Sequence, residues 1–329
     1  MIKFKFHWLV VLFMGNKLRV GVIGTGAWGK NHARVYSELP NVELVGVCDL
    51  KKENANHIAS TFGVKAYYDV DDFLDNANLD LISICTPTTT HYEIGMKAIE
   101  RNINVLVEKP VTTTVEQAIN LKNAADKKGV KLTVGFIERF NPVVQKIKEF
   151  KESGEVGDYV TINTMRIGPF WPERLWDVGV VKDSAIHDVD AIRHIIGRNP
   201  KTVYATGGAL KHKYEDHIFA ILDFDEQLKA TIEANFLTPY KLRKINVTGV
   251  NGIIEGDYMT QELKIETNDW IKKSKTKWKE PLKAELQAFV NAVINDEPPV
   301  VSGTDGIEVL KICEAILTSI KTGQPVKIS

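Results

Sequence analysis

The sequence predicts an α/β protein with two parts: an N-terminal doubly wound parallel sheet and a C-terminal α+β domain with a large, mostly antiparallel open sheet. Two patterns support this prediction. Over residues 18–135, short apolar runs alternate with amphipathic stretches, which is typical of strand–helix–strand units. Over residues 228–236, apolar and polar residues alternate strictly, as in a strand with one buried face. We expect domains over residues 16–135 and 136–329.

The composition shows no strong charge bias. The 329 residues include 42 lysines and arginines against 42 aspartates and glutamates, so no overall basic field favours nucleic acid or an anionic membrane. Cys48, Cys85 and Cys313 are too few and too widely spaced for a disulfide framework or a zinc ribbon. We therefore expect a cytoplasmic protein with no nucleic-acid partner and no stable membrane association.

Residues 1–15 do not follow the strand and helix pattern. Lys3 and Lys5 precede an apolar run from Trp8 to Met14, as at the start of a signal peptide. The run is too short to span a bilayer, and no cleavage site follows it. We expect a non-native or disordered extension with Met14 as the natural start. A weak membrane anchor is the alternative.

The first expected strand, residues 18–23, leads directly into a glycine-rich turn. Gly24, Gly26 and Gly29 have the spacing G-x-G-x-x-G, and a helix is expected over residues 28–39. In a Rossmann domain such glycines allow a tight turn and let the backbone approach a pyrophosphate at the helix N-terminus. The predicted cofactor-binding residues of this turn are Gly24, Thr25, Gly26, Ala27, Trp28 and Gly29.

An acidic residue follows the second expected strand, residues 42–47. Asp49 lies about twenty residues after Gly29, where a carboxylate can accept hydrogen bonds from both hydroxyls of the adenine ribose. The same carboxylate would repel a 2′-phosphate, so the predicted cofactor is NAD. Lys51 and Lys52 weaken this preference over NADP.

The rest of the first domain continues the alternation of strands and helices. We expect helices over residues 51–62, 69–77, 91–101 and 115–128, and strands over residues 66–68, 79–85, 103–107 and 130–134. Ligands bind at the carboxyl ends of the strands in such sheets. The segments after the fourth and fifth strands therefore supply further predicted cofactor-binding residues, namely Thr86, Pro87, Thr88, His91, Glu108 and Lys109. Capping of the following helix is the alternative role for the threonines.

The second half of the chain is dominated by strand patterns. We expect strands over residues 159–166, 218–224 and 228–236, and a hairpin of residues 244–250 and 253–257 around Asn251 and Gly252. These patterns predict a sheet of five or six strands. The charged stretch 270–280 is expected to be a surface connection. Helices are expected over residues 143–151, 281–294 and 305–321.

Two stretches have the composition of a catalytic site. On a regular helix, Asp183, His187, Asp190 and His194 would form one stripe, which fits a solvated face, a metal site or an acid–histidine pair that moves a proton. A single ion cannot reach all four side chains, so we predict no metal. Lys109 follows the fifth strand, near the expected nicotinamide. There it could bind a substrate hydroxyl and stabilise an alkoxide, or it could be an exposed turn lysine.

The motifs Gly24-x-Gly26-x-x-Gly29, Glu108-Lys109-Pro110 and Asp183-x-x-x-His187, in this order, resemble the glucose–fructose oxidoreductase / inositol dehydrogenase (Gfo/Idh/MocA) family. The resemblance implies that the catalytic residues are Lys109, Asp183 and His187. It also implies a cis bond before Pro110, and a homodimer or homotetramer that pairs the open sheets. The alternative to an enzyme is a non-enzymatic, dinucleotide-sensing regulator with this fold.

Within the family, the segments Trp28 to His32, Phe136 to Pro142 and Ser184 to Asp190 resemble those of the nucleotide-sugar members. This implies oxidation of the 3-hydroxyl of a UDP-activated amino sugar, UDP-N-acetylglucosamine, with His187 as base, Asp183 orienting it and Lys109 holding the oxyanion. The matching uronic acid, a free sugar or an inositol are the alternatives. The predicted substrate-binding residues are Lys109, Arg139, Asn141, Arg166, Trp171, Arg174 and His187.

Overall fold

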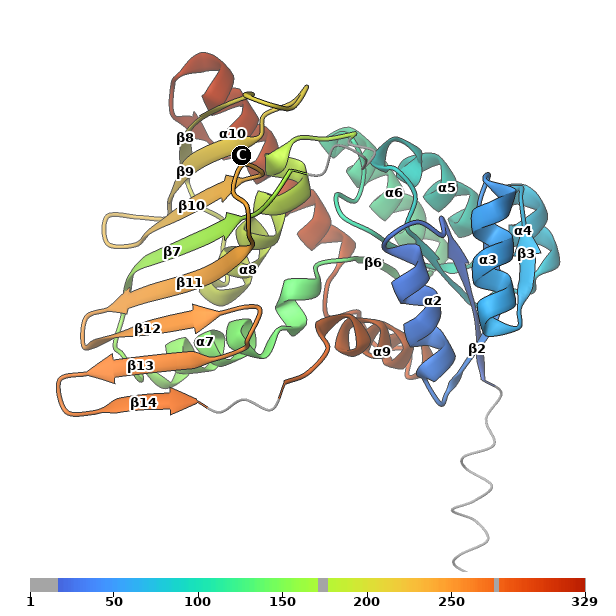
Figure 1. The fold of residues 1–329 in the computed structure, drawn as a ribbon, viewed down its shortest axis with the longest axis horizontal. Coiled ribbons are helices and arrows are strands. Elements are labelled where there is room, and N and C mark those ends of the chain that lie inside the picture. Colours follow the sequence, from blue (N-terminus) through green and yellow to red (C-terminus); the bar gives the residue numbers. More distant parts are fainter. Residues whose placement is uncertain (1–16, 171–176, 275–277, 329) are drawn as a thin grey trace, which may run out of the picture.

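The computed structural model describes residues 17–170, 177–274 and 278–328. The predicted N-terminal extension lies outside these ranges, as do Trp171 and Arg174 of the predicted substrate loop. The described chain forms two sheets that lie at opposite ends of the molecule, with helices between them (Figure 1).

The first domain is a six-stranded parallel sheet in the order β3-β2-β1-β4-β5-β6. Its strands are β1 (Leu18–Ile23), β2 (Val42–Cys48), β3 (Lys65–Tyr67), β4 (Leu81–Ile84), β5 (Asn104–Val107) and β6 (Leu132–Val134). The helices that connect them are α2 (Gly29–Glu38), α3 (Lys52–Phe62), α4 (Val70–Asn76), α5 (Thr88–Glu100) and α6 (Val115–Lys128). The prediction of a doubly wound Rossmann sheet is confirmed.

One helix boundary in this domain differs from the prediction by more than one residue. Helix α5 begins at Thr88, three residues before the expected start at His91. Pro87 provides a fixed φ of −59° at the N-cap position. The backbone N–H of Thr88, one of the unpaired donors of the first turn, donates to the carboxylate of Asp177 (2.6 Å), which takes the place of a local N-cap. Thr88 therefore lies inside the helix.

The second domain contains a nine-stranded sheet in the order β14-β13-β12-β11-β7-β10-β9-β8-β15. Neighbouring strands are antiparallel except for the parallel pair β7 and β10. The strands are β7 (Tyr159–Ile167), β8 (Thr202–Gly208), β9 (His217–Asp223), β10 (Lys229–Asn235), β11 (Leu242–Gly249), β12 (Gly252–Asp257), β13 (Leu263–Thr267), β14 (Ile271–Ser274) and β15 (Val326–Lys327). The expected mostly antiparallel sheet is confirmed.

The expected number of five or six strands was too low. Strands β8, β13, β14 and β15 were missed, and β14 lies in the stretch that was expected to be a surface connection. The sequence of β14 is I-K-K-S, with three exposed residues, and it forms one edge of the sheet. Charged edge strands protect a sheet from pairing with other chains, so they lack the apolar alternation that identifies an inner strand.

Helices cover one face of the large sheet. They are α7 (Pro142–Ser153), η2 (Val181–Ala185, a π-helical turn), α8 (Ile186–Ile196) and the long α10 (Gly303–Thr322) (Figure 1). The 3₁₀ turn η1 (Ile137–Phe140) packs against α7 and α8. The other face carries exposed apolar side chains on β8 and β9, including Tyr204, Phe219 and Ile221. A homodimer or homotetramer formed through this face stays a prediction.

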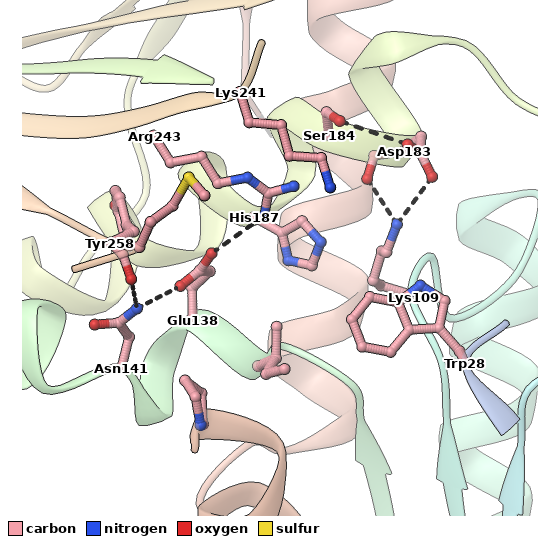
Figure 2. A pocket seen from close by; sticks show the side chains of 13 residues that line it. Trp28, Lys109, Glu138, Asn141, Asp183, Ser184, His187, Lys241, Arg243 and Tyr258 are labelled. Carbon is pink, nitrogen blue, oxygen red and sulfur yellow. Dashed lines mark hydrogen bonds and ion pairs between the residues drawn. The ribbon is translucent and has the colours of Figure 1, made fainter. Parts of the chain in front are cut away.

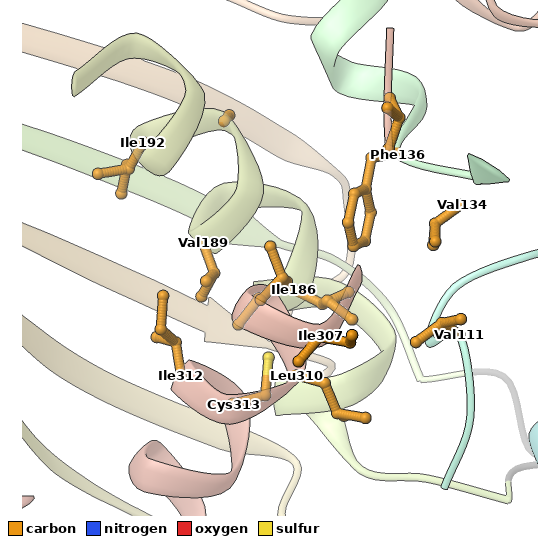
Figure 3. Close-up of a cluster of buried hydrophobic side chains, with 14 of the residues drawn as sticks. Val111, Val134, Phe136, Ile186, Val189, Ile192, Ile307, Leu310, Ile312 and Cys313 are labelled. Carbon is orange, nitrogen blue, oxygen red and sulfur yellow. The ribbon is translucent and has the colours of Figure 1, made fainter. Parts of the chain in front are cut away.

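The last two helices join the domains. Helix α9 (Pro281–Ile294) packs against α2, where Leu286 and Phe289 share a buried cluster with Val35 and Tyr36. Helix α10 contacts α6 of the first domain and both α8 and β8 of the second. Figure 3 shows this junction, whose buried apolar side chains include Val111, Val134, Phe136, Ile186, Val189, Ile307, Leu310 and Cys313. This shared core fixes the ends of β5 and β6 relative to α8.

In residues 17–170, 177–274 and 278–328, no helix is both long and apolar enough to cross a bilayer. All three cysteines are free thiols.

Candidate active site

The glycine turn after β1 has the shape that a dinucleotide requires. Gly24 has a φ of +86°, and a Cβ atom there would lie 2.7 Å from the backbone of Cys85. A Cβ atom at Gly29 would overlap the carbonyl oxygen of Gly24. A Cβ atom at Gly26 would meet nothing within 4 Å, so the space above the turn is open. The turn can therefore accept a pyrophosphate against the N-terminus of α2.

Asp49 lies beside this turn, immediately after β2. Its Oδ2 accepts hydrogen bonds from the backbone N–H and the hydroxyl of Thr25 (2.8 and 2.9 Å), and its Oδ1 accepts from the N–H of Lys51 (2.9 Å). These contacts fix the carboxylate next to the glycines. The glycines and Asp49 thus fit NAD, with the turn for the pyrophosphate and the carboxylate for the adenine ribose.

A buried polar network lies beneath the turn, and the sequence analysis did not identify it. The ring nitrogens of His32 lie 3.1 Å from Ser83 Oγ and 3.1 Å from Glu108 Oε1. Glu108 Oε2 accepts from the backbone N–H of Lys109 (3.1 Å). Burial alone would raise the pKa of Glu108, but the His32 hydrogen bond and the charge of Lys109 outweigh it and lower the pKa. Glu108 is thus held in the interior, where it fixes the backbone that carries Lys109.

The segment after β4 is fixed in a similar way. The buried His91 has its ring nitrogens 2.8 Å from the carbonyl oxygen of Thr86 and 2.9 Å from that of Pro110. The bond between Lys109 and Pro110 is cis, as the resemblance implied. The backbone N–H of Thr88 donates to Asp177 of the second domain (2.6 Å). The predicted cofactor residues Thr86 and His91 therefore bind each other, and their contact to a cofactor stays a prediction.

Lys109 contacts the second domain directly. Its Nζ donates to the backbone oxygen of Asp183 (2.6 Å) and to Asp183 Oδ1 (3.1 Å), as Figure 2 shows. Asp183 belongs to the π-helical turn η2, and such turns occur frequently at functional sites. The extra residue of a π turn alters the regular helical stripe that the sequence suggested. Asp183 thus orients Lys109, a contact that the sequence analysis did not anticipate.

His187 lies one turn further along, in α8. Asp183, His187 and Asp190 are all at least 90 % buried, so the alternative of a solvated helix face is wrong. The Nδ1 atom of His187 is buried and has no hydrogen-bond partner. Burial, together with the charges of Lys109, Arg166 and Arg243, holds the pKa of His187 well below its ordinary value. The ring is therefore neutral at pH 7 and can accept a proton.

Two of the predicted substrate-binding arginines form ion pairs with carboxylates in the interior, and their contact to a substrate stays a prediction. Arg139 pairs with Asp190 (2.7 Å) and Asp305 (2.9 Å). Arg166 pairs with Asp188 (2.7 Å) and Glu138 (3.0 Å) and is 2 % exposed. Removing either guanidinium would leave a buried carboxylate without its partner, so these arginines stabilise the fold around the site.

These side chains converge on one pocket of about 370 Å³ between the domains, a volume typical of ligand sites (Figure 2). It is lined by Trp28, Lys109, Ile137, Glu138, Asn141, Asp183, Ser184, His187, Lys241, Arg243, Tyr258, Met259 and Pro281. The predicted substrate residue Asn141 is present, and it donates to Glu138 Oε2 (3.0 Å). Lys241, Arg243 and Tyr258 were missed because they lie just outside the predicted hairpin strands 244–250 and 253–257, where no motif was recognised.

The pocket does not contain a recognisable metal site. In the part of the chain that the structure describes, no three histidine, cysteine, aspartate or glutamate side chains are grouped closely enough to hold an ion. Asp190 of the predicted stripe faces Arg139, so the stripe does not converge on one point.

Comparisons with known proteins match both domains. The family described as "Oxidoreductase family, NAD-binding Rossmann fold" matches residues 18–136, and "Oxidoreductase family, C-terminal alpha/beta domain" matches residues 152–328. Scyllo-inositol 2-dehydrogenase (NAD(+)) of Bacillus subtilis is 28 % identical over 96 % of this chain and 97 % of its own length.

UDP-N-acetylglucosamine 3-dehydrogenase of Acidithiobacillus ferrooxidans is also 28 % identical, over 89 % of this chain and 94 % of its own length. Its solved structure superposes with a TM-score of 0.85 and covers 93 % of this chain and 98 % of that chain. The two family matches cover most of the chain and agree with the glycine turn and the open sheet. This protein therefore belongs to the Gfo/Idh/MocA oxidoreductase family and is an NAD-dependent oxidoreductase.

Proposed function

We propose that this enzyme oxidises the 3-hydroxyl of a UDP-activated amino sugar, UDP-N-acetylglucosamine, to a ketone, with NAD as the hydride acceptor. One observation carries the chemistry: Lys109 from the first domain and Asp183 and His187 from the second line a single pocket. Trp28 of the glycine turn lines the same pocket, so the reacting groups lie next to the nucleotide turn.

The three side chains have distinct roles in this proposal. Asp183 holds the Lys109 ammonium through two hydrogen bonds, and a third N–H of the ammonium is directed to the substrate oxygen. A positive charge at this point stabilises the alkoxide that forms. The neutral imidazole of His187 accepts the hydroxyl proton. NAD, when bound at the turn, supplies an electrophilic carbon that takes the hydride.

The substrate assignment has two supports. The segments around Trp28, Phe136 and Ser184 resemble those of nucleotide-sugar enzymes, and the A. ferrooxidans relative acts on UDP-N-acetylglucosamine by its name. An inositol is the second candidate, because the B. subtilis relative is equally identical over a larger part of this chain. The same Lys109, Asp183 and His187 chemistry would serve both substrates.

The test measures NADH formation at 340 nm with UDP-N-acetylglucosamine, its uronic acid, free sugars, and myo- and scyllo-inositol. We expect turnover with the UDP-amino sugar, and a 3-keto product identified by NMR. Lys109→Met and His187→Ala should each lower the rate about 10²- to 10⁴-fold but keep NADH binding. Lys146→Met, which removes a half-exposed lysine that does not line the pocket, is the matched control.

Two results would count against this proposal. If both pocket variants keep near-normal rates, the roles given to Lys109 and His187 are wrong. If NADH forms with an inositol and with no UDP-sugar, the substrate is the second candidate.

A further inference from the structure

We propose that Lys241 and Arg243 bind the diphosphate of the substrate at the boundary between the reaction pocket and a smaller pocket beside it. The inference rests on the proposed function, since it assumes a nucleotide sugar. It names the two residues that would select an anionic substrate over a neutral polyol, and it goes beyond the predicted substrate-binding residues, which do not include them.

The two pockets form a continuous path. The smaller one has a volume of about 90 Å³ and lies at the ends of β7 and β10, where Ile167, Gly168, Asn235 and Phe236 line it. Four residues line both pockets, namely Asp183, Ser184, Lys241 and Arg243. A ligand longer than one sugar ring can therefore extend from His187 past Lys241 and Arg243 toward the ends of β7 and β10.

The local strand geometry directs both cations to this boundary. Lys241 immediately precedes β11 and Arg243 is its second residue, and side chains two positions apart point to the same face of a strand. Figure 2 shows both side chains extending toward His187 and Ser184. Lys244, the next residue, pairs with Asp257 (2.6 Å) and lines neither pocket.

The charges around the boundary favour an anion. Lys109, Arg166, Lys241 and Arg243 line the two pockets, against two carboxylates, Glu138 and Asp183. Glu138 Oε1 accepts from Arg166 at 3.0 Å and lies 3.8 Å from Arg243. Asp183 Oδ1 accepts from Lys109 at 3.1 Å. The Glu138 carboxylate therefore compensates Arg243 only weakly.

The positive charges around the boundary contribute to lowering the pKa of two groups, Arg243 and His187. Burial and then the charge of Arg166 lower the pKa of Arg243, and Lys109, Arg166 and Arg243 all lower that of His187 after burial. A bound diphosphate would offset these charges. Guanidinium and ammonium groups bind phosphate oxygens through charge-assisted hydrogen bonds, whereas an inositol brings no charge to compensate them.

The experiment measures binding by calorimetry with saturating NADH, so that the glycine turn is already occupied. The probes are UDP, inorganic pyrophosphate and uridine. We expect wild-type enzyme to bind UDP more tightly than uridine, and Lys241→Gln and Arg243→Gln each to raise the Kd for UDP about 10- to 100-fold. Arg243→Lys should recover part of the loss, because it restores the charge. Lys244→Gln is the matched control and should leave the Kd unchanged.

The outcomes separate this inference from the proposed function. If wild-type enzyme binds uridine as tightly as UDP, or if Lys241→Gln and Arg243→Gln bind UDP like wild type, the inference is overturned. If UDP binding depends on both residues but no UDP-sugar yields NADH, the diphosphate site stands and the proposed reaction fails. If UDP-sugars are oxidised and the variants raise KM for them along with the Kd for UDP, both stand.

Discussion

Two glycine-to-alanine substitutions in the nucleotide turn distinguish a residue needed for cofactor binding from one needed for the structure of the turn. In Gly26→Ala the new Cβ enters open space, so the apoprotein should keep its stability, while the methyl group lies where the pyrophosphate approaches. In Gly29→Ala the new Cβ overlaps the carbonyl oxygen of Gly24, so the turn must shift before any ligand is present.

The expected shifts in melting temperature follow from the size of the protein. At about 2.1 cal/mol/K per residue, a chain of 329 residues has an unfolding entropy of about 0.7 kcal/mol/K. A ligand at about 100 times its Kd stabilises a protein by about 2.7 kcal/mol, which is a rise in Tm of about 4 °C with NAD. Overpacking at Gly29 costs about 1–3 kcal/mol and should lower the Tm of the apoprotein by about 1.5–4 °C.

Differential scanning fluorimetry with and without NAD measures both effects. We expect Gly26→Ala to melt within about 1 °C of wild type without NAD, since changes at open positions cost about 0.5 kcal/mol or less, and to lose the 4 °C rise. Gly29→Ala should melt lower in both conditions. An NAD-induced rise in Gly26→Ala equal to that of wild type would refute this account of the turn.

Three further predictions concern protonation, the buried arginine and cofactor choice. Because the pKa of His187 is lowered, kcat/KM should stay constant as the pH is lowered to 6.5 and should fall only when the pH passes through the lowered pKa. A loss of kcat/KM that begins above pH 6.5 as the pH is lowered would contradict this. Below pH 6.5 the unfolded chain binds the proton that folded His187 excludes, so stability should also fall with pH in urea titrations. Arg139→Met should cost about 3–5 kcal/mol in urea unfolding by stranding Asp190, and a selective rise in substrate KM without a loss of stability would instead return Arg139 to the substrate site. Asp49→Ser should lower the ratio of kcat/KM with NAD to kcat/KM with NADP, because it removes the carboxylate that repels the 2′-phosphate. An unchanged ratio would show that Asp49 does not select the cofactor.

Local patterns in the sequence determined much of this protein. The bounds of α6 and α9 match the predicted ranges 115–128 and 281–294, because helix ends are marked by neighbouring residues: Thr114 and Gly129 cap α6, and Pro281 begins α9. The glycine spacing and Asp49 determined the nucleotide turn for the same reason. Lys109, Asp183 and His187 could be selected together because their motifs resemble those of a known family.

Only the tertiary structure decided how these groups are paired and buried. Asp183 and Asp190 are acidic residues of one segment, yet one binds Lys109 at the pocket and the other binds Arg139 in the interior. Lys241 and Arg243 line the same pocket as His187 of α8, although they lie more than fifty residues away in the sequence. Such pairings join residues far apart in the chain, and they depend on packing and on the cost of burying charge, which local sequence patterns do not encode.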